Sequence, residues 1–412
     1  MKQQKENKEF FAALDVGSDK VLCLVARPGD EPEMLRVIGI GNTPSSGIRN
    51  GCVVDVTAAV GSIRQAVREA GFTAGVEITG VWAAIGGHTL KSANCTGQTV
   101  LRGREVTRED VEQAELNARQ SALRDMKGES LLKLIPQGYR CGDLVTDKPV
   151  GLVGQKLEAD VHALYGSRTN ANNLKHAIQR VGLELINYEP HPWAAAQAVL
   201  SETEKTCGTA LIDIGAETTS LIVFREGRIL FTDVRPWGAE HFTRDLAIVL
   251  GISLEDAEAL KLRSGECRLS QVLPGEIVQI EVHGRTTRPY ARDLLVKTLS
   301  SRVRQFFGIY RKMLADAGVL DQVELVVLTG GGAMLRGIGE EAEAILDKHV
   351  RIGIPDRVEG ESPLLQRSDA AVAAGLAVCA LKESLSGPER AFGMRRSMSF
   401  LGGLKTFFLG DY

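Results

Sequence analysis

The sequence predicts an α/β fold of two related domains, with a small α+β unit inserted into the first domain and an amphipathic helix at the end. The pattern of apolar strand, Asp-x-Gly turn and second apolar strand occurs twice, in FAALDVGSDKVLCLV (11–25) and LIDIGAETTSLIVF (211–224). Such a long-range duplication favours two domains that face each other. Residues 88–165 have the pattern of strands around one helix, and the last residues repeat apolar side chains at helical spacing.

The composition is that of an ordinary globular protein with several domains. The chain has 412 residues, of which 44% are hydrophobic and 25% are charged, and its net charge is −3. This near-neutral balance gives no basic field for nucleic acid, so no nucleic-acid partner is expected. Seven scattered cysteines without a Cys-x-x-Cys pair favour reduced thiols over a zinc site. The start of the chain has no apolar signal core and no run is long enough to span a bilayer, so we expect a cytoplasmic protein.

The two Asp-x-Gly turns are candidate phosphate-binding loops. Gly17 and Gly215 let the backbone come close to a phosphate, and Asp213 at a strand end could hold Mg²⁺ through water. An ordinary tight hairpin explains either turn alone equally well. The duplication favours two loops that close on one nucleotide from opposite sides. A third turn, Gly330-Gly331-Gly332, follows the buried strand 325–328 and would let the backbone lie flat against a base and ribose.

The first domain begins after a polar tail at 1–9. Its hairpin is followed by a strand at 34–40, the loop SGIRNGCVVD (46–55) and a strand at 81–85. A helix is predicted at 57–70, where apolar residues form one stripe and Gly71 would end it.

The inserted unit is predicted to hold strands at 90–101, 131–141 and 158–165 around one helix at 108–126, with Thr107 as its N-cap. His88 and His162 have no partner at ligand spacing, so both are expected to be structural. Beyond the insert, the expected elements are helices at 170–181, 193–200, 241–250, 289–317, 339–348 and 369–382, and strands at 183–189 and 228–234.

Glu258 and Lys261 lie three residues apart in a helix predicted from residue 255. They form either a surface ion pair, worth a few tenths of a kcal/mol, or a pair that brackets an adenosine.

The end of the chain is a candidate membrane anchor. After a linker, Gly402 and Gly403 interrupt the apolar stripe and each weaken the helix by about 1 kcal/mol. The helix should therefore form only on a surface, and its basic and aromatic residues suit an anionic membrane. The alternative is a terminal helix docked on the protein's own core. The residues expected to contact the membrane are Phe400, Leu401, Leu404, Lys405, Phe407 and Phe408.

Together these motifs resemble the ATP-binding actin/Hsp70/sugar-kinase superfamily, and within it the FtsA family of bacterial cell-division proteins. The loop at 46–55 resembles the family's signature, and the insert with LIPQGY (134–139) and LEADVHALYG (157–166) resembles its small domain. AEALK (257–261) resembles the adenosine segment, and the terminal helix resembles the membrane anchor. The chain departs from the family at Ala216 and Glu217, where relatives usually carry glycines.

The resemblance implies an actin-like fold of two duplicated ATPase domains in four subdomains. The implied boundaries are 1–87 and 166–206 for subdomain 1A, 88–165 for 1C, 207–245 and 325–364 for 2A, 246–324 for 2B, 365–382 for a helix returning to 1A, 383–396 for a linker and 397–412 for the membrane helix.

The resemblance also implies a nucleotide site. Glu189 is placed like the residue that orients water in actin-like proteins, and a strand-end carboxylate is the alternative. The implied ATP ligands are Asp15, Gly17, Ser18, Asp19 and Lys20; Asp213, Gly215, Ala216, Glu217, Thr218 and Thr219; Gly238; and Glu258, Lys261, Gly330, Gly331, Gly332 and Met334.

The implied protein is at most a weak ATPase that polymerises and tethers the C-terminal tail of FtsZ to the cytoplasmic face of the inner membrane at the division septum. The tail would bind 246–324, where Arg292, Lys297, Arg302 and Arg304 lie on one helical stretch. Downstream division proteins would bind 88–165. Two alternatives remain: a small-molecule kinase, for which 88–165 supplies no obvious sugar site, and a pilus-assembly scaffold, which would not need the anchor.

Overall fold

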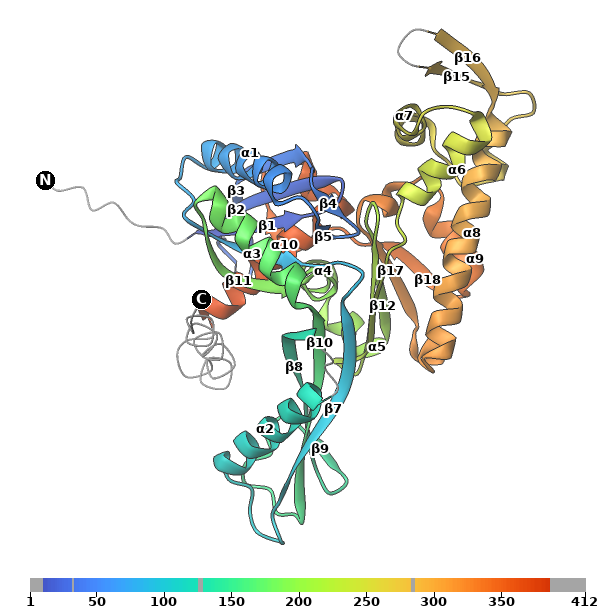
Figure 1. The fold of residues 1–412 in the computed structure, drawn as a ribbon. Helices are drawn as coiled ribbons and strands as arrows, with labels where there is room; N and C mark the ends of the chain where they lie inside the picture. Colours follow the sequence, from blue (N-terminus) through green and yellow to red (C-terminus); the bar gives the residue numbers. More distant parts are fainter. Residues whose placement is uncertain (1–9, 32, 125–128, 283–285, 386–412) are drawn as a thin grey trace, which may run out of the picture.

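The computed structural model describes residues 10–31, 33–124, 129–282 and 286–385. Two lobes lie side by side, and a third unit projects from the first lobe (Figure 1). Lobe I comprises 10–87, 166–206 and 358–385, the insert comprises 88–165, and lobe II comprises 207–357. The predicted terminal helix at 397–412 lies outside the described residues.

Lobe I is built on a sheet in the order β11-β6-β1-β2-β3-β19. Alternate residues of β1 face opposite sides, as the period of a strand requires: Leu14 packs towards α1 and α3, and Ala13 towards α4 and α10. The elements of lobe I are β1 (Phe11–Val16), β2 (Lys20–Pro28), β3 (Leu35–Pro44), β4 (Ile48–Arg49), β5 (Cys52–Val53), α1 (Val56–Ala74), β6 (Gly80–Ile85), α3 (Arg168–Val181), β11 (Glu184–Pro190), α4 (His191–Val199), α5 (Glu202–Cys207), β19 (Val358–Glu359) and α10 (Ala371–Leu385).

Helix α1 continues past the predicted stop at Gly71. Asp55 caps its start by accepting hydrogen bonds from the N–H groups of Thr57 and Ala58. The helix ends at Gly75, whose φ of 66° is left-handed, whereas Gly71 stays within the helix. A glycine therefore ends this helix only where the chain needs a left-handed residue.

Lobe II repeats the plan of lobe I. Its sheet has the order β14-β13-β12-β17-β18. In both lobes an antiparallel hairpin is extended by a parallel strand that pairs with its first strand, β6 with β1 and β17 with β12. The elements are β12 (Thr209–Ile214), β13 (Thr219–Arg225), β14 (Arg228–Arg235), α6 (Glu240–Leu250), α7 (Leu254–Ser264), β15 (Ile277–Val282), β16 (Thr286–Ala291), α8 (Arg292–Asp316), β17 (Leu325–Thr329), α9 (Ile338–Leu346) and β18 (His349–Ile352). The duplication predicted from the two Asp-x-Gly motifs is therefore confirmed.

Other boundaries also differ from the prediction, and strand pairing explains two of them. The long helix begins at Arg292 and not at Pro289, because 286–291 pair with β15. The chain rejoins the sheet of lobe I at β19, before residue 365, because Val358 and Glu359 pair with β3. Such a short strand carries no periodic signal in the sequence. Short 3-10 turns lie at η1 (Leu269–Gln271), η2 (Leu320–Gln322), η3 (Gly331–Met334), η4 (Pro363–Gln366) and η5 (Ser368–Ala370).

The insert is a four-stranded sheet in the order β7-β10-β8-β9, with α2 against one face. The elements are β7 (Lys91–Val100), α2 (Arg108–Arg124), β8 (Glu129–Cys141), β9 (Leu144–Thr146) and β10 (Lys156–Ser167). The insert also touches lobe II through β14. Gln137 donates to the Ile229 carbonyl and accepts from its N–H, and Ser92 and Asn94 donate to the carbonyls of Thr232 and Leu230.

His162 belongs to this contact between the insert and lobe II. It is buried, and its ring nitrogens lie 2.6 Å from Asn94 Oδ1 and 3.0 Å from Thr232 Oγ1. Burial lowers the pKa of His162 to about 4. The histidine is therefore structural, as its sequence context predicted.

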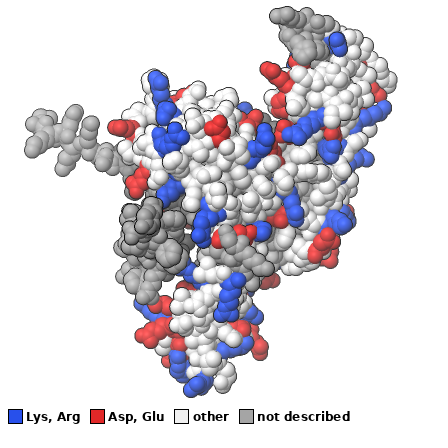
Figure 2. Space-filling model, in the orientation of Figure 1, with Lys and Arg blue, Asp and Glu red and all other residues white. Residues whose placement is uncertain are grey.

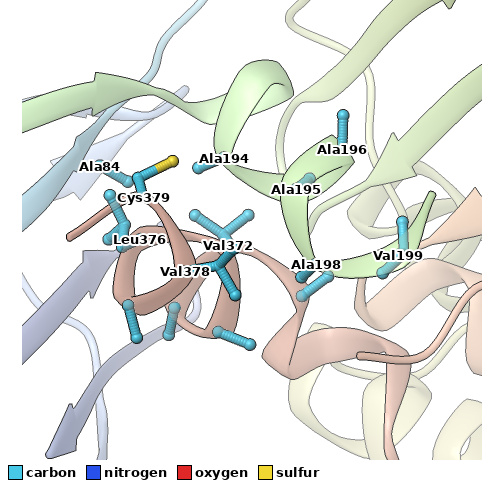
Figure 3. Close-up of a cluster of buried hydrophobic side chains, with 14 of the residues drawn as sticks. Ala84, Ala194, Ala195, Ala196, Ala198, Val199, Val372, Leu376, Val378 and Cys379 are labelled. Atoms are coloured by element: carbon cyan, nitrogen blue, oxygen red, sulfur yellow. The ribbon is translucent and has the colours of Figure 1, made fainter. Parts of the chain in front are cut away.

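Helices α4 and α10 fill the space between the two sheets. Figure 3 shows Ala194 on α4 beside Leu376 and Cys379 on α10, in a cluster made mostly of small side chains. A Cβ at Gly375 would lie 1.8 Å from the Ala194 carbonyl oxygen, so only glycine permits this approach. The small-residue helix predicted at 369–382 thus packs closely against α4, and α4 in turn contacts β12 and β13 of lobe II.

On the face shown in Figure 2, Lys and Arg are interspersed with Asp and Glu. Exposed ion pairs on such a surface contribute only about 0–1 kcal/mol each. No helix in the described part of the chain combines the length and the apolar character needed to cross a bilayer.

Candidate functional site

A cavity of about 840 Å³ lies between the lobes and brings the two Asp-x-Gly turns and the glycine turn together. Both Asp-x-Gly turns close with the same backbone hydrogen bond, from the Gly17 N–H to the Lys20 carbonyl (3.0 Å) and from the Gly215 N–H to the Thr218 carbonyl (2.9 Å). The predicted residues that line the cavity are Asp15, Gly17, Ser18, Asp19, Lys20, Asp213, Gly215, Ala216, Glu217, Thr218, Glu258, Lys261, Gly330, Gly331, Gly332 and Met334.

His191 bridges the two aspartates of these turns. It is the first residue of α4, and its Nε2 lies 2.9 Å from Asp15 Oδ1 while its Nδ1 lies 3.6 Å from Asp213 Oδ2. Burial disfavours its charged form, but the two carboxylates outweigh burial and raise the pKa of His191 to about 10. An imidazolium therefore links lobe I to lobe II at the base of the cleft.

His191 was not among the predicted site residues, although the sequence carries a signal for it. Glu189-Pro190-His191-Pro192 stands at a strand-to-helix junction, and β11, β6 and β1 are parallel neighbours in one sheet. The carboxyl ends of these strands share one edge, which is the edge where Asp15 lies. Pairing the strands in this order would have placed a histidine beside that aspartate.

Lys20 of the first turn is held by Asp369, whose carboxylate lies 2.7 Å from its Nζ. Asp369 also accepts from Arg367. Burial raises the pKa of Asp369, but its cationic neighbours outweigh burial, so the pKa is lowered overall. Lys20 is thus kept near the first turn by a residue just before α10.

The three glycines of the third turn have different roles. A Cβ at Gly330 would lie 2.3 Å from Asp213 Oδ1, and one at Gly332 would lie 2.3 Å from Ile214 Cγ2. A Cβ at Gly331 would have Cβ of Asp369 as its nearest neighbour, 3.9 Å away. Gly330 and Gly332 are therefore required for packing against the end of β12, and Gly331 faces open space in the cleft.

Glu258 and Lys261 lie at another part of the cleft wall. Lys261 Nζ lies 2.7 Å from Glu258 Oε2 and 2.8 Å from Thr243 Oγ1. The two residues form an ion pair and also line the cavity. An ion pair and a pair that brackets an adenosine are thus compatible interpretations of these two residues.

The structure places three predicted site residues outside the cavity lining. Glu189 is buried and pairs with Lys133 of the insert at 2.7 Å, because it faces β8 and not the cleft. Burial raises its pKa despite the opposing effect of Lys133. Thr219 is buried and donates to the Trp237 carbonyl, and a Cβ at Gly238 would lie 2.3 Å from the Ala216 carbonyl oxygen. Thr219 and Gly238 therefore support the second turn from behind.

The four basic residues predicted to receive a partner's tail already have acidic neighbours. Arg302 makes two hydrogen bonds to Asp245, at 2.5 and 2.7 Å. The other three ion pairs are Arg292–Glu276, Lys297–Asp293 and Arg304–Glu341. Their charges are thus largely balanced within lobe II.

A duplicated sheet domain that closes on a glycine-lined cleft defines the actin-like class of proteins. Solved structures of this fold include the PilM–PilN type IV pilus biogenesis complex (TM-score 0.66, 18% identity, 90% of this chain and 98% of that one). Spiroplasma citri MreB5 bound to ADP is also similar (TM-score 0.54, 14% identity, 92% and 99%).

Sequence comparison identifies the family within this class. Residues 210–377 match the family model for cell division protein FtsA, and 87–165 match the SHS2 domain inserted in FtsA. Cell division protein FtsA of Neisseria meningitidis is 34% identical over 93% of this chain and 94% of its own length. The Pseudomonas aeruginosa protein of the same name is 31% identical over 93% of this chain and 92% of its own length. The Escherichia coli protein is 30% identical over 90% of this chain and 90% of its own length. The chain belongs to the FtsA family of cell-division proteins, so the resemblance predicted from its motifs is confirmed.

Proposed function

We propose that this protein binds ATP in the cleft between its lobes, polymerises, and anchors FtsZ to the cytoplasmic face of the inner membrane at the division septum. The observation that carries the nucleotide part is the convergence of both Asp-x-Gly turns and the glycine turn on one cavity. Membership of a family of cell-division proteins supports a role in cell division. One neighbour of the same fold, MreB5 of Spiroplasma citri, was solved both with ADP and with AMPPNP.

The residues present fit a nucleotide with Mg²⁺. The backbone of the two turns and Lys20 would hold phosphates, and the open face at Gly331 would receive the base and ribose. Mg²⁺ commonly uses one or two carboxylates with water and phosphate oxygens, a role that Asp213 fits through water. The ion would neutralise phosphate charge. Glu189 is held away from the cleft by Lys133, which agrees with at most a weak ATPase.

The test is nucleotide binding by Gly331→Asp, measured with a fluorescent ATP analogue. Because the position is open, the variant should fold, and its carboxylate would project towards the nucleotide. We expect binding to be lost. Gly331→Ala is the matched control for added bulk and should retain most of the affinity. Unchanged affinity in folded Gly331→Asp would reject this location.

The proposed FtsZ surface is within 246–324. Because its basic residues are already paired, exposed apolar residues are better candidates for contact with a partly apolar tail. Ile248 and Val249 of α6 are 78% and 47% exposed, and neither lines the cleft cavity. Ile248→Glu with Val249→Glu should abolish binding of an FtsZ tail peptide, whereas Val100→Glu, at an exposed site on the insert, should not. Equal binding by all three proteins would place the surface elsewhere.

The membrane part of the proposal concerns residues outside the described part of the chain. Phe407→Glu with Phe408→Glu should release the full chain from anionic vesicles in a pelleting assay and leave nucleotide binding intact. Each buried ring could contribute on the order of 1–3 kcal/mol, and polymerisation would multiply the attachment. Pelleting of the double variant would favour the docked-helix alternative.

The remaining parts of the proposal rest on family membership. Downstream division proteins would bind the insert at 88–165, which projects away from the lobes. The likeness to the pilus complex is at 18% identity and reflects the fold alone. Neither it nor the small-molecule kinase alternative has a specific observation in its favour.

A further inference from the structure

We propose that Glu217 is a specificity-determining residue of the cleft. Its carboxylate accepts a hydrogen bond from the backbone N–H of Asn50, at the end of the cleft where the phosphates would lie, and so disfavours a terminal phosphate. The site would then prefer a nucleoside diphosphate to a triphosphate. This inference rests on the proposed nucleotide binding and adds which phosphate chain the site selects.

The N–H in question belongs to the tip of the β4–β5 hairpin. Asn50 and Gly51 have φ angles of 49° and 70°, and the flanking residues Arg49 and Cys52 pair with each other. Two positive φ angles across a two-residue loop define a type I′ turn, for which Asn-Gly is a preferred sequence. The N–H groups of the two central residues make no ladder bond in such a turn, so they are free to bind another group.

These two N–H groups point at the two Asp-x-Gly turns. The Gly51 N–H donates to Ser18 Oγ of the first turn at 3.1 Å, and the Asn50 N–H donates to Glu217 Oε2 of the second turn at 2.5 Å. Ile48, Gly51 and Val53 of the same hairpin line the cavity. The carboxylate of Glu217 therefore satisfies a donor beside both turns, which is what an anionic phosphate oxygen would do there.

The hairpin is fixed to lobe I, so it cannot readily follow Glu217 away from the cleft. A Cβ at Gly51 would lie 2.8 Å from the Gly87 backbone nitrogen, which shows how closely the tip packs. The Val53 N–H donates to Asn170 Oδ1, and the His88 N–H donates to the Asn50 carbonyl. Glu217 belongs to lobe II, and its bond to Asn50 is thus a contact between the lobes across the phosphate end.

Two cationic side chains that line the cavity beside the Asp-x-Gly turns already have carboxylate partners. Lys20, which would hold phosphates, shares its charge with Asp369, and His191 bridges Asp15 and Asp213, so neither cation fully offsets the Glu217 carboxylate. A terminal phosphate would bring further negative charge beside the Glu217 carboxylate. Like charges repel more strongly in a partly buried site than in bulk water, because the effective dielectric constant is lower there. A diphosphate ends earlier and avoids most of this repulsion. The Glu217 carboxylate therefore weakens the binding of a triphosphate more than the binding of a diphosphate.

The experiment compares Mg·ADP and Mg·ATP binding by calorimetry on the full chain and on Glu217→Gln. The amide oxygen of glutamine can still accept from Asn50, so this variant removes the charge and keeps the contact. We expect Mg·ATP affinity to rise about tenfold, while Mg·ADP affinity changes less than about threefold. Glu226→Gln, at the turn between β13 and β14, is the matched charge control and should change neither affinity.

A second variant tests the contact itself. Glu217→Gly should increase hydrogen exchange at the amides of 46–55 in the nucleotide-free protein, and Glu226→Gln should not. An unchanged ratio of ADP to ATP affinity in Glu217→Gln, or unchanged exchange in Glu217→Gly, would overturn the proposal and leave nucleotide binding standing. Failure of every protein, wild type included, to bind either nucleotide would overturn the proposed function and this inference with it.

Discussion

Replacing Gly375 with alanine should destabilise the protein by forcing α4 and α10 apart. The added Cβ would lie 1.8 Å from the Ala194 carbonyl oxygen, where an ordinary carbon–oxygen contact is about 3.3 Å. The obstacle is a backbone atom and not a flexible side chain, so the helices would have to separate by roughly 1.5 Å. Both helices belong to the cluster that joins the sheets of the two lobes (Figure 3).

The magnitude follows from two opposing effects. Overpacking of a well-packed core typically costs about 1–3 kcal/mol. The cost at Gly375 should lie at or above the upper end of this range, because two packed helices must move apart and no side chain can rotate away instead. Alanine gains about 1 kcal/mol over glycine in helix propensity. We expect a net loss of about 2 kcal/mol or more in the free energy of unfolding.

Urea and thermal unfolding of the full chain would measure this loss. Gly61→Ala in α1 and Gly308→Ala in α8 are matched controls, because a Cβ at either position meets no heavy atom within 4 Å. Both should be neutral or stabilise by about 0.4–1 kcal/mol. If Gly375→Ala is as stable as these controls, the two helices are not in close contact and the reasoning fails.

Two further predictions concern buried charges. Lys133→Ala should destabilise the protein by about 3 kcal/mol because it leaves the Glu189 carboxylate buried without its cation, and Glu189→Gln in the same chain should recover most of the loss in urea unfolding. The pKa of His191 is raised from its ordinary value of 6.5 to about 10, so its stabilising contribution is full below pH 6.5 and is lost as the pH rises through 10. Unfolding measured across that window should show a decline that His191→Gln removes; an equal decline in this variant would contradict the bridge between Asp15 and Asp213.

Local patterns predicted most of the fold. The duplicated hairpins and the insert follow from apolar periodicity and turn residues close together in sequence, so their elements formed near the predicted positions. Helix α1 overran its predicted end because Gly71 and Gly75 look alike in sequence, and only Gly75 takes a left-handed φ. The short strand β19 exists only because β3 is beside it.

The site was predictable where its residues sit in motifs and not where distant residues meet. Both Asp-x-Gly turns line the cleft. His191 meets Asp15 across 176 positions of the chain, and Asn50 meets Glu217 across 167. Glu189 likewise pairs with Lys133 of the insert, a residue that is distant in the sequence. No periodicity encodes such pairings, because they depend on how the lobes and the insert pack.

The hydrogen bonds from the insert to β14 bear on aggregation. β14 is the last strand of its sheet, and an open strand edge is a template for pairing with another chain. Ser92, Asn94 and Gln137 supply side-chain partners to the backbone of that edge. The insert therefore covers the edge strand β14 of lobe II. A shortened chain without residues 88–165 would expose the edge of β14, so insoluble product from such a deletion would reflect the uncovered strand and not the loss of a binding partner.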